Sequence, residues 1–180
     1  MLACLTRGVK IMEVNMNGLQ VRYQQIGDAK RFYEILTNPD FILFPVKPKS
    51  IEAEKRFLRT TKRLRENNVA YNYTILLRRR VVGAIGIKID QHRTYIGEIG
   101  YFVDRKYWGR EIAVNAVNLI EDICFDELGL ERIEINTLKQ NVLSIRVAEK
   151  CGYKKEGIQR HKIKLGGKWE DAYLFAKVKN

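Results

Sequence analysis

The 180-residue sequence predicts a single domain of mixed α/β architecture, with one largely antiparallel twisted sheet and helices on both of its faces. Two observations carry this prediction. Three short segments rich in β-branched and aromatic residues follow one another directly, as in an antiparallel meander. A later segment from Ile112 repeats apolar residues every three or four positions, as a helix does when one face packs on a sheet.

The chain is expected to divide into an N-terminal tail over 1–17 and one domain over 18–180. The first residues, "MLACLTRGVKIMEV", contain too few consecutive apolar residues for a secretory signal, and Met12 offers an alternative start. No linker rich in Gly, Ser or Pro interrupts the remainder. We therefore expect one hydrophobic core, which a chain of this length is able to bury.

The first half of the domain is predicted to open with a strand and two helices. "LQVRYQQI" (19–26) alternates like a half-buried strand, and "DAKRFYEIL" (28–36) follows as a helix with Asp28 as its N-cap. The prolines of "FPVKPKS" forbid regular helix, and Ser50 is placed to cap a second helix over 51–66.

The centre of the sheet is predicted from three consecutive strands, 70–77, 81–89 and 95–103, which are joined by short polar turns. An amphipathic helix from Ile112 follows, and Gly129 ends it.

The last third of the chain is predicted as a strand over 132–138, a short helix over 141–152 and two strands around "GGK" (166–168). The complete order is then one strand, two helices, three strands, helix, strand, helix and two strands.

The charge balance favours anionic partners. Lys and Arg number 33 against 21 Asp and Glu, which gives a formal net charge of +12. A generally basic surface explains the same balance. On the helix over 51–66, basic residues recur at helical spacing; they are Lys55, Arg56, Arg59, Lys62 and Arg63. They form either a solvated helix face or a rim that attracts an acidic acceptor or ribosomal RNA.

Other patterns narrow the class of protein. No apolar run approaches the roughly 18 residues of a membrane-spanning helix, so no membrane partner is expected. Cys4, Cys124 and Cys151 are far apart and lack the spacing of metal ligands, so no metal site is predicted. Unpaired thiols of this kind suit a reducing compartment, and we expect a cytoplasmic protein.

One strand–turn–helix segment has the pattern of an anion site. "YFVDRKYWGREIAVNAV" (101–117) runs from an apolar strand through a basic turn into a helix, whose first N–H groups have no intrahelical partner. Lys106 and Arg110 add positive charge, and Gly109 allows close backbone approach. A phosphate group suits this turn. The alternative is a plain strand-to-helix turn with Glu111 as a capping residue.

Three stretches in this order resemble the GCN5-related N-acetyltransferases, and most closely the branch of ribosomal-protein N-terminal acetyltransferases. They are "EIGYFVDRKYWGRE", "NVLSIRVAEKCGYKKEG" and "LGGKWEDAYLF", and the resemblance covers roughly residues 18–178. It implies an acyl-CoA N-acyltransferase fold whose sheet splays between the strands at 95–103 and 132–138.

The resemblance also implies how acetyl-CoA is bound. The family's pyrophosphate turn has the pattern Gln/Arg-x-x-Gly-x-Gly/Ala. Lys106 fills the first position and Gly109 the central glycine, whereas Glu111 stands where glycine or alanine is usual. The pantetheine arm is expected along the splayed strand end, and the pyrophosphate in the turn. The implied cofactor-binding residues are Phe102, Val103, Lys106, Gly109, Arg110, Glu111, Ile112, Asn141 and Ser144.

Two catalytic residues are implied in the same way. Glu98, flanked by apolar residues in "YIGEIGYF", is the expected general base and acts through a water; the alternative is a solvent-facing or paired strand glutamate. Ser144 is expected near the departing sulfur, after Asn141, whose alternative role is a helix N-cap. The tyrosine that many relatives carry one turn further on is replaced here by Ala148.

The resemblance thus implies an N-acetyltransferase that transfers acetyl from acetyl-CoA to a primary amine, such as a ribosomal-protein N-terminus, without a covalent intermediate. An amine on a small molecule or nucleotide sugar is the alternative acceptor. Two other classes stay open: a non-catalytic acyl-CoA-binding regulator and a basic module that binds RNA or the ribosome. A homodimer through the last strands is also expected, although no residue pattern marks it.

Overall fold

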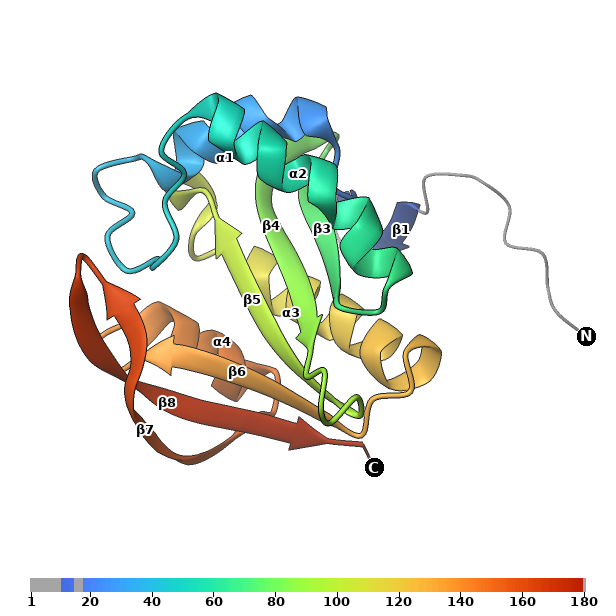
Figure 1. Ribbon diagram of the computed structural model, residues 1–180, viewed down its shortest axis with the longest axis vertical. Coiled ribbons are helices and arrows are strands. Elements are labelled where there is room, and N and C mark those ends of the chain that lie inside the picture. The colour runs from blue at the N-terminus through green and yellow to red at the C-terminus, as the bar shows by residue number, and fades with distance from the viewer. Residues whose placement is uncertain (1–10, 15–17, 180) are drawn as a thin grey trace, which may run out of the picture.

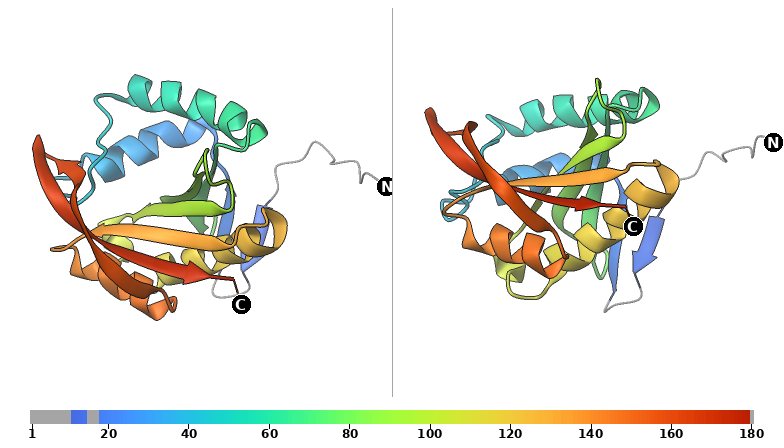
Figure 2. Two further views of the ribbon diagram at one scale, coloured as in Figure 1. Left: turned by 60° about the horizontal axis from the view of Figure 1, so that its bottom comes forward. Right: turned by 90° about the horizontal axis from the view of Figure 1, so that it is seen from below.

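A computed structural model describes residues 11–14 and 18–179, and it confirms the predicted mixed α/β fold. One eight-stranded sheet runs in the order β1-β2-β3-β4-β5-β6-β8-β7. Helices α1 and α2 cover one face of this sheet, whereas α3 and α4 cover the other (Figures 1 and 2). The predicted order of elements is therefore confirmed from β2 onward.

The elements lie close to the predicted ranges. The strands are β1 (Ile11–Val14), β2 (Leu19–Tyr23), β3 (Ala70–Leu77), β4 (Arg80–Ile89), β5 (Ile96–Val103), β6 (Arg132–Leu138), β7 (Lys154–Leu165) and β8 (Lys168–Val178). The α-helices are α1 (Ala29–Leu36), α2 (Ile51–Glu66), α3 (Ile112–Asp122) and α4 (Val142–Lys150). A π-helical segment, η3 (Ile123–Glu127), extends α3.

Part of the range expected as a tail takes part in the sheet. Residues Ile11–Val14 form β1, which pairs antiparallel with β2. The remaining positions of 1–17, among them Cys4, lie outside the described residues. Cys124 and Cys151 are both buried thiols.

The sheet opens at one position in its centre. β5 and β6 are the one parallel pair among the described strands, and they are in register only over Ile96–Glu98 and Arg132–Glu134. β5 continues to Val103, so its last residues lie beside no strand on that edge. Figure 1 shows the two strands diverging from this point. The predicted splay is confirmed.

Alternation along β5 directs its side chains to two different faces. Phe102 packs edge-to-face on Phe32 of α1, with 5.4 Å between the ring centroids, so it belongs to the face that α1 and α2 cover. Val103 belongs to the core cluster with Ile112 of α3. Glu98 and Gly100 therefore share the α1/α2 face with Phe102, whereas Tyr101 faces α3 and α4.

The helix caps differ at the two N-termini predicted from the sequence. Ser50 caps α2 as predicted, since its hydroxyl accepts a hydrogen bond from the Ala53 N–H at 3.1 Å. Asp28 precedes α1, but its side chain makes no capping hydrogen bond to that helix. It instead accepts from Arg22 Nη2 at 2.6 Å and from the Thr74 hydroxyl at 2.6 Å. The predicted N-cap role is wrong, because buried partners on β2 and β3 occupy the carboxylate.

Replacing Asp28 with asparagine is expected to lower the free energy of unfolding by about 2 kcal/mol at pH 7, because charged hydrogen bonds to Arg22 and Thr74 are lost. Burial by itself raises the pKa of Asp28, but the hydrogen bonds from Arg22, Thr74 and the Gln25 N–H lower it below 3.8. A group with a lowered pKa in the folded state stabilises above its ordinary pKa, and this contribution disappears as the pH falls through the folded value.

Urea unfolding at pH 7 and at stepwise lower pH measures this effect. The difference between wild type and the asparagine variant should shrink below about pH 4. Glu34→Gln is the matched control, since Glu34 pairs with Arg31 on the exposed surface and should contribute within about 0.5 kcal/mol. A difference for Asp28→Asn that does not change with pH would contradict this account.

The basic face of α2 is partly neutralised by its own acids. Lys55 and Arg59 both form ion pairs with Glu52, and Lys62 pairs with Glu66. Arg56 and Arg63 complete the predicted face. These pairs favour the reading of a solvated helix face, and the proposed rim for an acidic partner stays a prediction.

Candidate active site

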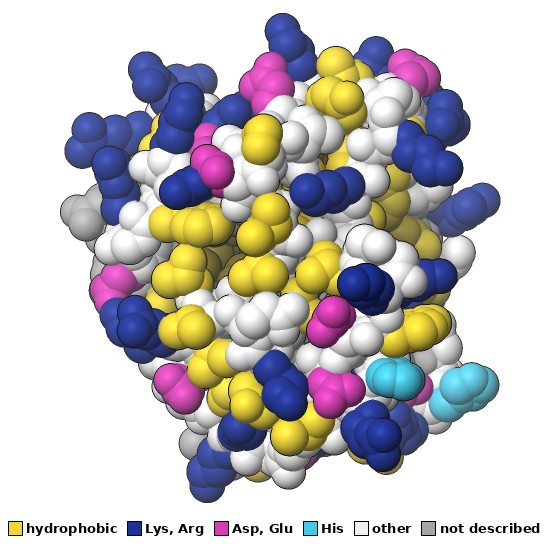
Figure 3. All heavy atoms as spheres, turned by 90° about the vertical axis from the view of Figure 1, so that its left-hand side faces the viewer, with side chains coloured by type: hydrophobic (Ala, Val, Ile, Leu, Met, Phe, Trp, Pro, Cys, Tyr) yellow, Lys and Arg dark blue, Asp and Glu magenta, His cyan; other side chains and the backbone are white. Residues whose placement is uncertain are grey.

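A cavity of about 700 Å³ opens where β5 leaves β6. Its wall combines the end of β5, the turn into α3, the start of α4 and the loop between α1 and α2. Figure 3 views this side of the molecule and shows hydrophobic side chains gathered around a hollow, with lysines and arginines toward the outer edge. A cavity of this size accommodates a cofactor arm together with a second small group.

The turn ahead of α3 has the backbone form of an anion-binding loop. Gly109 has φ +75°, and a side chain there would meet nothing within 4 Å, so the turn is open toward the cavity. Glu111 has φ 57° and ψ 12°, the left-handed conformation that a non-glycine residue adopts only at an energetic cost. Both residues line the cavity. The family pattern places glycine or alanine at Glu111, and the left-handed backbone explains glycine there.

The carboxylate of Glu111 points to α4 and makes no capping hydrogen bond to α3. It accepts a hydrogen bond from Lys150 Nζ at 2.5 Å, and this bond and the lysine charge lower the pKa of Glu111. The structure therefore contradicts the alternative of a capping glutamate. Because the carboxylate is paired with a cation, it opposes a nearby phosphate less than an isolated charge would.

Two basic residues of the turn that were expected to bind the cofactor do not line the cavity. Lys106 and Arg110 are not part of the cavity wall, and the Arg110 guanidinium lies over the Tyr107 ring at 5.6 Å from its centroid. The basic side chains that do line the cavity are Arg105, Arg146 and Lys150, none of which the sequence pattern singled out.

The splayed end of β5 presents backbone groups to the cavity. Asp104 N–H donates to the Val82 carbonyl of β4 at 2.7 Å, and alternation along an antiparallel pair then directs the N–H groups of Tyr101 and Val103 toward the open edge. The Val103 carbonyl already accepts from Trp108 Nε1 at 2.7 Å. Phe102, Val103 and Ile112 all line the cavity, as the sequence predicted for a cofactor-binding wall.

The start of α4 adds two predicted polar residues. Asn141 is the N-cap, because its side-chain oxygen accepts from the Ser144 N–H at 3.1 Å, so the alternative role given to it is observed. The Ser144 hydroxyl lies 2.9 Å from the Tyr101 hydroxyl. Asn141, Ser144 and Tyr101 all line the cavity.

Tyr101 is a polar residue of the cavity wall that sequence reasoning missed. Burial raises the pKa of Tyr101 to about 12, so its phenol keeps its proton at neutral pH. Ala148, where many relatives carry tyrosine, is fully buried. Alternation in "EIGYF" already assigns Tyr101 to the face opposite Glu98, but no local pattern indicates its contact with Ser144, which lies 43 residues away.

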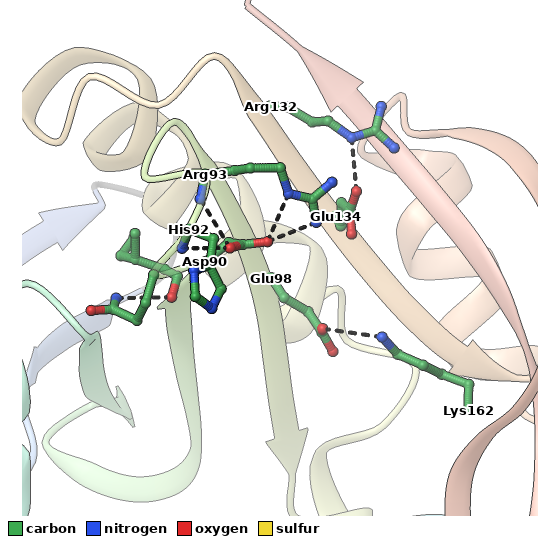
Figure 4. A network of polar contacts seen from close by, with 9 residues as sticks. Asp90, His92, Arg93, Glu98, Arg132, Glu134 and Lys162 are labelled. Carbon is green, nitrogen blue, oxygen red and sulfur yellow. Dashed lines mark hydrogen bonds and ion pairs between the residues drawn. The ribbon is translucent and has the colours of Figure 1, made fainter.

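Glu98 lies on the α1/α2 face of β5, outside the cavity wall and close to β7. Its side chain is 46% exposed, and Oε2 lies 3.9 Å from Lys162 Nζ (Figure 4). The neighbouring carboxylate on β6, Glu134, instead accepts from Arg132 at 2.8 Å. Glu98 is thus an accessible strand glutamate paired with Lys162. This matches the alternative given above, a solvent-facing or paired strand glutamate.

The face of β5 between Glu98 and the cavity residue Phe102 is unobstructed at Gly100, and we call this strip of the strand face the lane. Gly100 lies between Glu98 and Phe102 on the same face, and a Cβ atom built on Gly100 would meet no atom within 4 Å. A molecule entering along this lane reaches Glu98 at one end and the cavity wall at Phe102 at the other. Glu98 and Ser144 thus lie on opposite faces of the splayed strand.

Neither a metal site nor a membrane-spanning helix is found in the described residues. Within residues 11–14 and 18–179, no cluster of His, Cys, Asp and Glu has the arrangement of a metal site. No helix of the described part is long and apolar enough to cross a membrane. His161 lies on β7 with its backbone N–H donating to the Asp171 carboxylate at 3.1 Å.

Comparisons with known proteins add independent findings. The family model described as acetyltransferase (GNAT) domain matches residues 19–154. YjcK of Bacillus subtilis (strain 168), described as a probable N-acetyltransferase, is 33% identical over 130 residues, which are 71% of this chain and 72% of that protein.

Solved structures of two acetyltransferases share the fold. Ribosomal-protein-S5-alanine acetyltransferase from Vibrio fischeri superimposes with a TM-score of 0.84 at 24% identity, covering 95% of this chain and 97% of that one. The microcin C7 self-immunity acetyltransferase MccE, solved with acetyl-CoA and AMP, gives 0.81 at 22% identity, covering 91% and 94%.

Proposed function

Because this chain belongs to the GNAT acetyltransferase family, we propose that it transfers an acetyl group from acetyl-CoA to a primary amine in the cavity where β5 and β6 separate. The observation that supports this most directly is the combination, in one cavity, of a phosphate-type turn, a splayed strand edge and a paired Ser144 and Tyr101. The proposal treats residues 18–180 as one catalytic domain.

The residues of the cavity fit coenzyme A. The first turn of α3 offers backbone N–H groups and the positive end of the helix dipole to the pyrophosphate, and Gly109 leaves room for close approach. The N–H groups on the open edge of β5 suit the amides of the pantetheine arm. Arg146 adds positive charge to the same wall. When bound, acetyl-CoA supplies a thioester whose carbonyl carbon accepts the amine.

Glu98 supplies the base in this proposal. A protonated amine must lose a proton before its nitrogen lone pair can attack, and Glu98 is accessible from the lane over Gly100. Its carboxylate takes the proton through a water, while the amine nitrogen bonds to the carbonyl carbon. A backbone N–H on the open edge of β5 donates to the carbonyl oxygen, where negative charge develops.

Ser144 and Tyr101 act on the other side of the strand. As the carbon–sulfur bond breaks, the Ser144 hydroxyl donates a hydrogen bond to the sulfur that receives the negative charge. The Tyr101 hydroxyl in turn donates to Ser144, because its high pKa keeps it protonated. The Tyr101 hydroxyl thereby takes the role of the tyrosine hydroxyl that Ala148 lacks.

The acceptor is a protein N-terminus or a small-molecule amine in this proposal. The solved relatives include a ribosomal-protein acetyltransferase and an acetyltransferase crystallised with AMP, which support one alternative each. In the sequence alone, Glu111 and Ala148 are the residues that favour a non-catalytic acyl-CoA-binding regulator, because both depart from the family pattern. Neither residue favours it now, because Lys150 neutralises Glu111 and Tyr101 lies beside Ser144.

Calorimetric titration with acetyl-CoA at physiological salt tests the proposal, with ATP as a control polyanion. We expect acetyl-CoA to bind at micromolar concentration or below and at least about ten-fold more tightly than ATP. Glu111→Gly should strengthen acetyl-CoA binding by no more than about five-fold, since it removes a paired charge, and should raise the melting temperature by relieving the left-handed backbone.

Glu111→Gln separates the two effects, because it removes the charge and keeps the side chain on the left-handed backbone. It should share the gain in affinity without the gain in melting temperature. Weaker acetyl-CoA binding by Glu111→Gly would show that the turn does not hold the pyrophosphate. Equal binding of ATP and acetyl-CoA would remove the basis for the proposed transfer.

A further inference from the structure

The acceptor end of the cavity is built from aromatic rings. Phe41 and Phe44 of the α1–α2 loop meet Phe102 with ring centroids 6.3 Å and 5.5 Å away, and Phe41 also lies 6.1 Å from Trp108. We name Phe41, Phe44, Phe102 and Trp108 the aromatic wall. All four line the cavity.

The rim of this cavity leaves apolar side chains in contact with water. Ile42 is 63% exposed and Trp108 40%, and on the opposite rim Val142 and Leu143 are 52% and 47% exposed. All four line the same cavity. Exposed apolar side chains around the mouth of a cavity are typical of a binding site, because covering them with an apolar group removes them from water.

The charges of the cavity argue against a second cationic group on the acceptor. Among the described residues, its wall contains two carboxylates, those of Asp40 and Glu111. Asp40 forms an ion pair with Arg105, and Glu111 forms one with Lys150. Arg146 has no carboxylate partner in the described part of the chain. An additional ammonium group would therefore meet net positive charge.

We propose that the acceptor is a primary amine with an aromatic or branched aliphatic group next to the amine, and that the aromatic wall binds this group. The inference rests on the proposed function and deepens it by naming the class of acceptor. The amine lies over Gly100 between Glu98 and the thioester, and its side group packs against Phe44 and Phe102. Polyamines and small unbranched amines are poor acceptors.

A panel of four amines tests this inference: the C-terminal amides of phenylalanine, leucine and alanine, and spermidine. The first readout is kcat/KM for acetyl transfer. The second is the dissociation constant of each amine, measured calorimetrically on protein saturated with coenzyme A. We expect phenylalanine and leucine amides to exceed alanine amide by at least about ten-fold in both, with spermidine last.

Phe44→Ala should reduce the preference for phenylalanine amide over alanine amide, while acetyl-CoA binding stays unchanged. Phe57→Ala is the control for loss of a phenylalanine ring, because Phe57 lies on α2, is 45% exposed and does not line the cavity. The preference should survive in that variant.

The outcomes separate the inference from the proposed function. Transfer to alanine amide or spermidine at an equal or higher kcat/KM would overturn the inference and leave the proposed function standing. An unchanged preference in Phe44→Ala would do the same. Absence of transfer from bound acetyl-CoA to every amine would overturn the proposed function and this inference with it.

Discussion

Replacing Glu98 with glutamine is expected to lower kcat for acetyl transfer by about 100- to 1,000-fold at neutral pH, because general base catalysis contributes on this order. The loss should be largest where the acceptor amine is protonated and should fade as the pH rises toward the pKa of the amine. Binding of acetyl-CoA should not change, since Glu98 does not line the cavity. Initial rates across a pH series, with calorimetric binding beside them, measure both effects.

Glu134→Gln is the matched control for this variant. Glu134 lies directly opposite Glu98 in the β5–β6 register and carries the same charge, but Arg132 holds its carboxylate. Its replacement should change kcat by less than about two-fold if the effect of Glu98 is proton transfer and not local charge. Unchanged turnover in Glu98→Gln would remove Glu98 from the mechanism.

Replacing Gly100 with valine is expected to reduce acetyl transfer by more than about 100-fold while the protein folds and binds acetyl-CoA normally. The isopropyl group would fill the lane between Glu98 and Phe102, and a displacement of the amine by about 1 Å already costs this much in rate. The added Cβ atom meets no protein atom within 4 Å, so no clash opposes folding. Valine also favours an extended strand.

Gly27→Val controls for the added bulk, because Gly27 in η1 (Ile26–Asp28) is likewise unobstructed and does not line the cavity. Thermal unfolding and acetyl-CoA titration should match wild type for both variants, and transfer should fail only in Gly100→Val. Normal transfer by Gly100→Val would show that the acceptor does not cross this part of β5. The transfer lane would then have to be sought elsewhere on the cavity rim.

Much of the fold follows from local patterns in the chain. Enrichment in β-branched and aromatic residues over 70–77, 81–89 and 95–103, with short polar turns between these segments, predicts the meander. The spacing of apolar residues after Ile112 predicts α3 in the same way. Ser50 and Asn141 act as helix caps, as their residue types allow. Each of these features depends on neighbours within a few residues.

Errors and omissions arose where distant partners compete for a side chain. Asp28 has the residue type and position of an N-cap, but Arg22 and Thr74 bind its carboxylate more favourably than the helix N–H groups do. Glu111 has the position of a capping residue, but Lys150 of α4 takes its side chain. In both cases a charged partner from another element replaces a neutral local hydrogen bond.

The sequence by itself therefore determined which elements form from β2 onward, in which order, and which strand–turn–helix segment is the candidate phosphate site. Only the tertiary structure decided which side chains meet. The end of register between β5 and β6 at Glu98 opens the cavity, and the return of α4 brings Ser144 to Tyr101 and Lys150 to Glu111. The α1–α2 loop likewise reaches Phe102 by the packing of α1 on β5. Periodicity specifies local conformation, whereas contacts between distant residues depend on how strands pair and where that pairing stops.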